Sequence, residues 1–144
     1  MKTTGASGFS LSAKPIDIAI LTEALFDPAA GACVTFEGRV RNANEGRMVE
    51  WLEYEAYEAV AMKEGAKVID EALSNRENIA VRCVHRVGHL AIGEIAVWIG
   101  VISAHRDEAF RVCRFVIDEV KGRVPIWKKE QYSDGSASWV ENAG

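Results

Sequence analysis

The segment Lys121–Glu130 gathers positive charge in a chain that is acidic as a whole. Up to Lys129 it contains no carboxylate and four cations, which are Lys121, Arg123, Lys128 and Lys129. A lysine beside other cations has its charged form disfavoured, so its pKa falls and its free amine becomes available as a nucleophile or an acid/base group. Pro125 and Trp127 would stiffen the segment, as a catalytic lysine needs. A solvated basic turn is the alternative interpretation.

Two further clusters are candidates for binding an anion. Arg39 and Arg41 end an expected strand and would share one of its faces, where guanidinium groups suit a phosphate or a carboxylate. His105 and Arg106 follow a long apolar segment and begin an expected helix, where unpaired backbone N–H groups and the helix dipole favour an anion. Surface ion pairs for the two arginines, and a structural role for the histidine, are the alternatives.

His85 and His89 have a spacing that binds zinc when it occurs on a helix. The residues around them alternate as in a strand and include Gly88, which breaks that geometry. No carboxylate or third histidine has a suitable spacing, so we predict neither a metal site nor a bound cofactor.

The composition limits the classes of protein that fit. The chain has 144 residues, enough for one domain with its own core, which we place at residues 15–144. Its 17 basic and 21 acidic residues give a net charge of −4, and residues 48–78 alone carry 3 basic and 8 acidic residues. An acidic chain disfavours general binding to nucleic acid or to a membrane surface. A local basic pocket is still compatible with this charge.

Cysteine usage and hydropathy indicate the compartment. The three cysteines are widely spaced in apolar runs and form no C-x-x-C motif, which predicts buried free thiols in a reducing cytoplasm; they are Cys33, Cys83 and Cys113. The longest uncharged apolar stretch, Ile95–Ala104, has 10 residues, too few to cross about 30 Å of hydrocarbon. The polar N-terminus lacks the apolar core of a signal peptide, and we expect residues 1–14 to be a flexible tail.

Hydrophobic periodicity predicts the elements that must position the charged clusters. Helices are expected over residues 15–25, 58–75 and 105–120, the last ended by Gly122 and Pro125. Strands are expected over residues 32–41, 48–57, 79–87, 95–104, 127–132 and 137–140, with a turn between Gly88 and Gly93. Strands that follow one another in pairs, with helices between the pairs, indicate an α+β fold rather than a doubly wound parallel sheet.

Four short strings together resemble the large, catalytic subunit of molybdopterin synthase. They are FEGRVRN at residues 36–42, HRVG at 85–88 followed by GE at 93–94, SAHR at 103–106, and KGRVPIWKKE at 121–130. Each string alone is a weak signal, but the four occur in the order found in that family and cover about residues 15–140. The combination is therefore specific.

The resemblance implies a fold, a reaction and partners. The implied fold is an α/β hammerhead-like arrangement with an additional small antiparallel β-sheet. The implied reaction converts cyclic pyranopterin monophosphate into molybdopterin by building a dithiolene, with sulfur taken from the thiocarboxylated Gly-Gly C-terminus of a small ubiquitin-like subunit. A homodimer within a heterotetramer is expected from the family. The sequence leaves open which strand forms the dimer contact, whether one site borrows residues from the other copy, and the order of the two sulfur transfers.

The same resemblance assigns roles residue by residue. The two lysines of the family's K-x-R-x-P-x-W-K pattern fall on Lys121 and Lys128, which become the expected catalytic amine and a second cationic or acid/base group. The expected substrate-binding residues are Arg39, Val40, Arg41, His105, Arg106, Lys129 and Glu130. The cysteines are expected to support stability, because the sulfur comes from the partner.

Two other functions fit some of these residues. A non-enzymatic module could hold a ubiquitin-like tail or a small phosphate ester in the same basic groove, and it would tolerate arginine in place of lysine because charge is kept. A small phosphoesterase could use His105, but it would need a second acid/base group or a metal.

Overall fold

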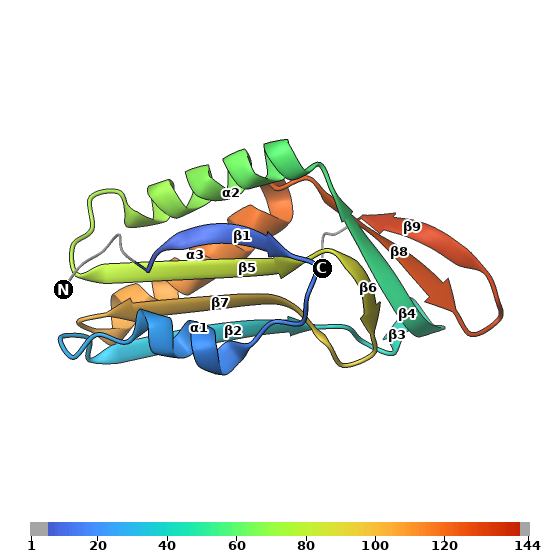
Figure 1. The fold of residues 1–144 in the computed structure, drawn as a ribbon, viewed down its shortest axis with the longest axis horizontal. Helices are drawn as coiled ribbons and strands as arrows, with labels where there is room; N and C mark the ends of the chain where they lie inside the picture. Colours follow the sequence, from blue (N-terminus) through green and yellow to red (C-terminus); the bar gives the residue numbers. More distant parts are fainter. Residues whose placement is uncertain (1–5, 142–144) are drawn as a thin grey trace.

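The computed structural model describes residues 6–141, and in it two β-sheets meet at an angle (Figure 1). The first sheet has the strand order β1-β5-β7-β2. Its strands are β1 (Gly8–Ser12), β5 (Ile79–Arg86), β7 (Ile95–Ser103) and β2 (Ala32–Arg39). β1 runs parallel to β5, and the other two pairings are antiparallel. β2 therefore lies at one edge of this sheet.

The second sheet is antiparallel and carries the C-terminal hairpin. Its main strands, in order, are β3 (Ala43–Asn44), β4 (Arg47–Ala56), β8 (Ile126–Tyr132) and β9 (Ala137–Glu141), and β6 (Gly88–Ala91) also pairs with β4. In β4, Leu52 and Tyr54 are buried, while Glu53 and Glu55 on the other face are half-buried or exposed. This alternation is the one that the sequence predicts for a half-buried strand.

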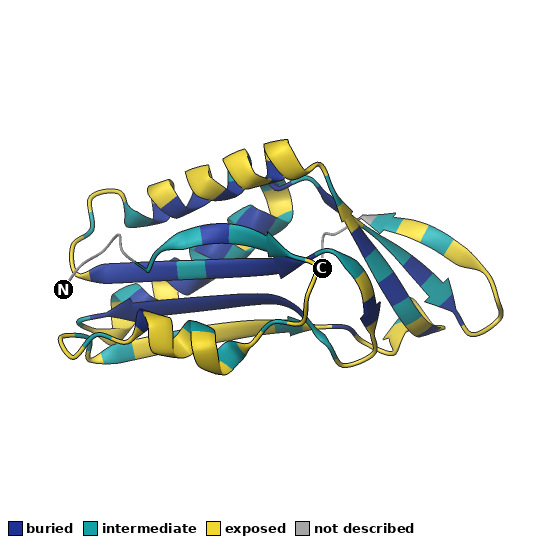
Figure 2. Cartoon of the chain, viewed as in Figure 1, coloured by how far each residue is buried: buried dark blue, intermediate teal, exposed yellow. Residues whose placement is uncertain are grey.

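Three helices cover the first sheet: α1 (Ile18–Leu25), α2 (Glu58–Leu73) and α3 (Arg106–Arg123). The main core lies between the sheet and the apolar stripes of α2 and α3, where Val68, Val112 and Val116 have no exposed surface. α1 packs on the other face of the sheet, against a smaller cluster that includes the fully buried Trp98. Figure 2 shows the two central strands, β5 and β7, as the most continuously buried part of the sheet. These arrangements confirm the α+β class.

The N-terminal segment differs from the flexible tail expected over residues 1–14. Residues 8–12 form β1, which pairs with β5 in parallel register. Phe9 is buried against α2, and a Cβ on Gly65 would lie 2.2 Å from the Phe9 ring, so the helix can approach this closely only because that residue is glycine. Phe9 and Leu11 alternate with small or polar residues, a short strand-like period that the prediction of a flexible tail overlooked. Pairing with a strand some 70 residues away orders this segment. Residues 1–5 of the expected tail lie outside the described residues.

Three smaller expectations are also corrected. The segment expected as a turn between Gly88 and Gly93 contains β6, which pairs with β4. α3 continues through Gly122 to Arg123, so Gly122 does not end it. Cys33 is exposed, unlike the buried Cys83 and Cys113, because α1 contacts β5 and β7 but does not cover β2.

Candidate active site

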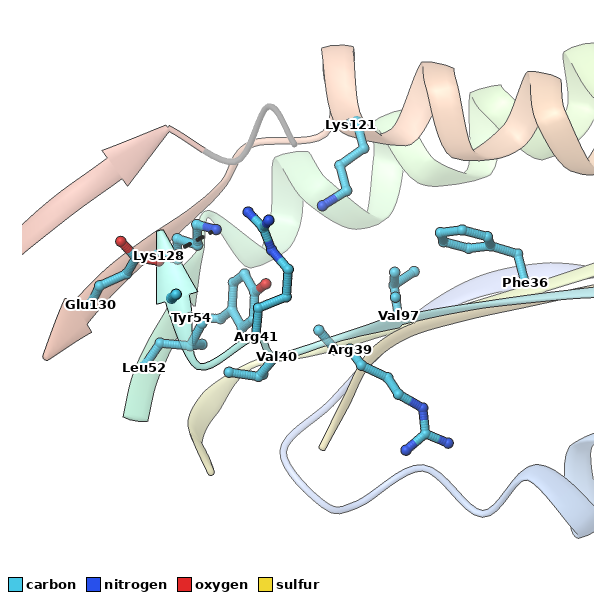
Figure 3. A pocket seen from close by; sticks show the side chains of 13 residues that line it. Phe36, Arg39, Val40, Arg41, Leu52, Tyr54, Val97, Lys121, Lys128 and Glu130 are labelled. Carbon is cyan, nitrogen blue, oxygen red and sulfur yellow. Dashed lines mark ion pairs between the residues drawn. The ribbon is translucent and has the colours of Figure 1, made fainter. Parts of the chain in front are cut away.

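A cavity of about 310 Å³ lies where the two sheets meet the C-terminal end of α3 (Figure 3). Residues from β2 and the segment after it, from β4, β7 and β8, and from the last turns of α3 form its walls. Its charged or hydroxyl-bearing side chains are Arg39, Arg41, Tyr54, Lys121, Lys128 and Glu130. The cavity therefore gathers residues from two of the four strings singled out in the sequence, those at residues 36–42 and 121–130.

Lys121 enters the cavity from α3 with an altered acidity. Burial, and to a smaller extent the nearby charge of Lys128, lower the pKa of its ammonium group to about 8. The cluster of cations in the sequence predicts a lowered lysine pKa through charge repulsion, whereas in the structure desolvation is the larger cause. At neutral pH this amine can therefore both hold and release a proton.

Lys128 and Glu130 reach the cavity because they occupy alternate positions on β8. Nζ of Lys128 lies 3.8 Å from Oε2 of Glu130, whose side chain is 4% exposed. Oε1 of Glu130 accepts hydrogen bonds from Asn44 Nδ2 and from the Tyr132 hydroxyl, each at 2.9 Å. The buried carboxylate is thus held in place by two donors and a cation, as a buried charge requires.

Lys129 does not share this environment, contrary to the expectation that it binds substrate. It lies between Lys128 and Glu130 on β8, so the pleat of the strand turns its side chain to the opposite face. Its Nζ lies 5.8 Å from the centre of the Trp139 ring on β9, and it is absent from the cavity lining.

Arg39 and Arg41 also separate, although the sequence predicts that they share a strand face. The pairing of β2 with β7 shifts register between Gly38 and Arg39, and β2 ends at Arg39. Arg39 pairs with Glu37 at 2.7 Å and donates to the Gly93 carbonyl at 3.1 Å. In Figure 3 its guanidinium points away from the lysines, whereas that of Arg41 lies between them. Arg41 is therefore the arginine whose charge serves the cavity.

Val40, the third residue of this group, is part of the wall. It is 5% exposed, its N–H donates to the Glu94 carbonyl, and its own carbonyl accepts from the N–H of Gly93. Glu94 in turn pairs with the buried Arg86 at 3.0 Å. Residues of the HRVG and GE strings therefore hold the segment that carries Arg41 in place, through the backbone of Gly93 and Glu94 and the Arg86–Glu94 ion pair.

His105 and Arg106 do not reach the cavity of their own chain. His105 caps the N-terminus of α3 and Arg106 is its first residue, while Lys121 lies near the other end. The 18-residue helix is about 27 Å long at 1.5 Å per residue. Both side chains are exposed, so within one chain these two expected substrate-binding residues are absent from the site.

Tyr54 is a polar residue of the site that the sequence did not single out, and His85, considered there only as a possible metal ligand, packs behind it. Burial and the charge of Glu130 raise the pKa of Tyr54 to about 12. His85 has no exposed surface, its Nδ1 lies 2.8 Å from the Arg86 carbonyl oxygen, and burial lowers its pKa to about 4. The two rings meet edge to face with centroids 5.0 Å apart. The alternation of β4 predicts that the Tyr54 side chain points inward. The neighbouring residues in the sequence do not show that it faces a cavity rather than packed core.

The charge of the cavity defines the ligand that it can hold. Arg41, Lys121 and Lys128 face one carboxylate, that of Glu130, so an anion would be attracted. No group of three or more His, Cys, Asp or Glu side chains in residues 6–141 is arranged to hold a metal ion. No helix in that range is long and apolar enough to cross a bilayer.

Comparison with known sequences gives the relatives of this chain. Residues 11–123 match the family described as MoaE protein. A molybdopterin synthase catalytic subunit from Oryza sativa subsp. indica is 45% identical over 127 residues. That alignment covers 88% of this chain and 65% of the rice protein, so the chain spans about two-thirds of the length of this relative.

Comparison with solved structures gives the same family. A molybdopterin synthase from Staphylococcus aureus superposes with a TM-score of 0.84 at 37% identity, covering 97% of this chain and 98% of that one. A complex of subunits 1 and 2 of the molybdopterin-converting factor from Helicobacter pylori contains a chain that matches with a TM-score of 0.76 at 20% identity, covering 92% of this chain and 90% of that chain. The Staphylococcus aureus structure confirms the expected fold. The Helicobacter pylori chain, at 20% identity, shows similarity of fold alone.

Proposed function

Because this chain belongs to the MoaE family of molybdopterin synthase catalytic subunits, we propose that it transfers sulfur to cyclic pyranopterin monophosphate and so builds the dithiolene of molybdopterin. The sulfur donor is the thiocarboxylated Gly-Gly C-terminus of a small ubiquitin-like subunit. A two-subunit assembly is described for the Helicobacter pylori protein, which supports a partner of this kind.

One observation carries the proposal: Lys121 and Lys128 share a cavity with Arg41, and burial makes the first amine titrate near neutrality. Both reactants are anionic, one through its phosphate and the other through its thiocarboxylate. Fixed cations in a partly enclosed cavity attract these groups and stabilise the negative charge that develops as sulfur is transferred. The site thus has the charge and the proton-accepting group that the reaction needs.

We assign the roles as follows. Arg41 and Lys128 hold the phosphate or the polar edge of the pterin. Lys121 assists the attack of the thiocarboxylate sulfur on the pterin and then the attack of water on the resulting thioester, which breaks the acyl C–S bond, leaves sulfur on the pterin and releases the tail as a carboxylate. An amine with a pKa of about 8 can accept a proton and return it at neutral pH. Glu130 fixes Lys128 through the 3.8 Å ion pair.

His105 and Arg106 enter this proposal through a second copy of the chain. β2 is the edge strand of the first sheet in the described part of the chain, and its free edge borders an apolar groove of about 580 Å³ against α3. Phe36 on β2 and Phe110 on α3 line this groove and are 37% and 61% exposed. An edge strand flanked by exposed aromatic side chains is suited to pairing with a partner strand.

The register of β2 explains how such a dimer would complete the site. Ala32 at one end of β2 lies opposite Ser103, two residues before His105, and Arg39 at the other end borders the cavity. If two copies of β2 pair antiparallel about a two-fold axis, the Ala32 end of one copy meets the Arg39 end of the other. His105 and Arg106 of each copy would then approach the cavity of its partner, which accounts for their distance from the cavity of their own chain.

The test is reconstitution of the reaction. The purified chain is mixed with a thiocarboxylated small subunit and cyclic pyranopterin monophosphate, and the dithiolene product is assayed. Lys121→Ala should lower product formation by about 100-fold or more, the usual scale of an acid/base contribution, while Lys63→Ala on the exposed face of α2 serves as the control. Lys121→Ala activity within a few-fold of wild type would overturn the assignment.

Lys121→Arg separates the proposed enzyme from a binding module. Arginine keeps the positive charge but cannot release a proton near neutral pH. We expect this variant to bind the small subunit and to form little product. Full activity with arginine would favour the binding module and count against amine chemistry.

A further inference from the structure

The hydroxyl of Tyr54 faces the cavity and is a hydrogen-bond donor that residues 6–141 leave unused. Tyr54 is 5% exposed and lines the cavity with the end of its side chain (Figure 3). Among residues 6–141, no side chain or backbone group makes a hydrogen bond with its hydroxyl, whereas Tyr132 on the next strand has two such partners, Glu130 and Ser138. Because the ring is buried and its hydroxyl faces the cavity, a ligand bound there can become its hydrogen-bond partner.

The surroundings of Tyr54 define what kind of partner would fit. Arg41 and Lys128 line the same cavity, and Figure 3 shows the tyrosine ring between these two side chains. Burial, and to a smaller extent the charge of Glu130, disfavour ionisation of the phenol, which therefore stays neutral and able to donate across the physiological range. A neutral donor beside two cations is suited to an oxygen or sulfur atom that carries negative charge.

The ring of Tyr54 is fixed from behind. His85, fully buried, meets it edge to face at 5.0 Å, and its own Nδ1 is tied to the Arg86 carbonyl. That carbonyl can only accept, so Nδ1 carries the proton and the imidazole is held in one tautomer. A ring packed in this way can direct its hydroxyl with little loss of side-chain entropy on binding.

We propose that Tyr54 is a further substrate-contacting residue, whose hydroxyl donates a hydrogen bond to the anionic group bound between Arg41 and Lys128. The inference rests on the proposed function, because that function supplies the anion. The acceptor is an oxygen or sulfur of an acidic group, which either the phosphate of the pterin or the C-terminal carboxylate of the partner's tail provides.

Tyr54→Phe tests the proposal because it removes the hydroxyl and keeps the ring. Two probes are titrated into the full chain by calorimetry: a peptide ending in Gly-Gly with a free carboxylate, and inorganic phosphate. Loss of a hydrogen bond to a charged group should weaken binding of one probe by about tenfold or more, and the affected probe identifies the source of the acceptor. Tyr57→Phe, at an exposed tyrosine outside the cavity, is the matched control and should bind both probes as wild type does.

Stability and activity distinguish the remaining outcomes. Removing a hydroxyl without a protein partner should leave the midpoint of urea unfolding unchanged or slightly raised. Unchanged affinity for both probes, or a loss of stability that accompanies the loss of binding, would overturn the role of Tyr54. Absence of product from the wild-type chain in the reconstituted reaction would instead overturn the proposed function itself.

Discussion

The ammonium group of Lys128 lies 3.8 Å from Oε2 of Glu130, a carboxylate that is almost completely removed from solvent. This pair fixes one positive charge in the wall of the cavity that Lys121 enters from α3. The fixed charge and the burial of Lys121 act in the same direction on its amine. The proton affinity of Lys121 is therefore set by two things: its burial at the end of α3 and the charge of Lys128 on β8.

Replacing Lys128 by glutamine should move the pH dependence of the reaction. The charge of Lys128 contributes to lowering the Lys121 pKa to about 8, so its removal should shift the rising limb of the pH–rate profile to higher pH. Lys129→Gln removes the same charge from the opposite face of β8 and should leave the profile in place. Product formation measured between pH 6 and pH 10 checks both variants, and an unshifted profile for Lys128→Gln would contradict the coupling.

Lys121→Met should stabilise the fold at neutral pH while abolishing activity. The folded-state pKa of about 8 lies below the ordinary lysine value of 10.5, so the cost of burying the charged lysine acts in full below pH 8. This cost is relieved as pH rises from about 8 to about 10.5. We expect a gain of about 2 kcal/mol in unfolding free energy at pH 7, and a smaller one at pH 10.

Urea unfolding at the two pH values measures that difference. Lys63→Met, on the exposed face of α2, provides the control for replacing a lysine without relieving burial. A Lys121→Met chain that is less stable than wild type at pH 7 would show that the lysine is not held in a strained, desolvated state.

Two inactive variants should restore activity to each other if the site is shared. In a dimer, Lys121→Ala damages the cavity of its own copy, while Arg106→Ala damages that of its partner. When equal amounts exchange subunits, half of the dimers are mixed and each has one intact site, so about a quarter of the wild-type activity should return. Mixing either variant with itself is the control. Activity that stays at the level of the single variants would place Arg106 outside the shared site.

The cysteines should matter for stability according to their burial and not for sulfur transfer. Cys83 has no exposed surface and burial raises its pKa to about 12, so its thiol stays protonated and unreactive. Cys83→Ser should lower the unfolding free energy by about 1–3 kcal/mol because a hydroxyl is buried in an apolar core. Cys33→Ser, at an exposed position, should change it by less than about 0.5 kcal/mol. Loss of product formation in a folded cysteine variant would contradict a partner-derived sulfur.

Several parts of the fold followed from local pattern. The helical spacing of Ala61, Gly65 and Val68 and the alternation of Leu52 and Tyr54 both record which side of an element is buried, and the structure buries those residues. The position of Lys128 on β8 also follows from local signals, whereas Lys121, expected just beyond a helix ending at residue 120, lies on the last turns of α3. Local periodicity can reveal such elements because it depends on neighbours within a few residues.

Other features depend on contacts that no local pattern contains. β2 ends at Arg39, so Arg41 does not continue its pleat and the two side chains diverge, and the length of α3 carries His105 away from the cavity of its own chain. The sequence by itself determined most of the helices and strands and the charged residue types of the matching strings, since these depend on short-range patterning, but it did not reveal β1 or β6. Tertiary structure alone decided which charges share the cavity and how deeply Lys121 and Glu130 are buried, because desolvation is produced by segments far apart in the chain.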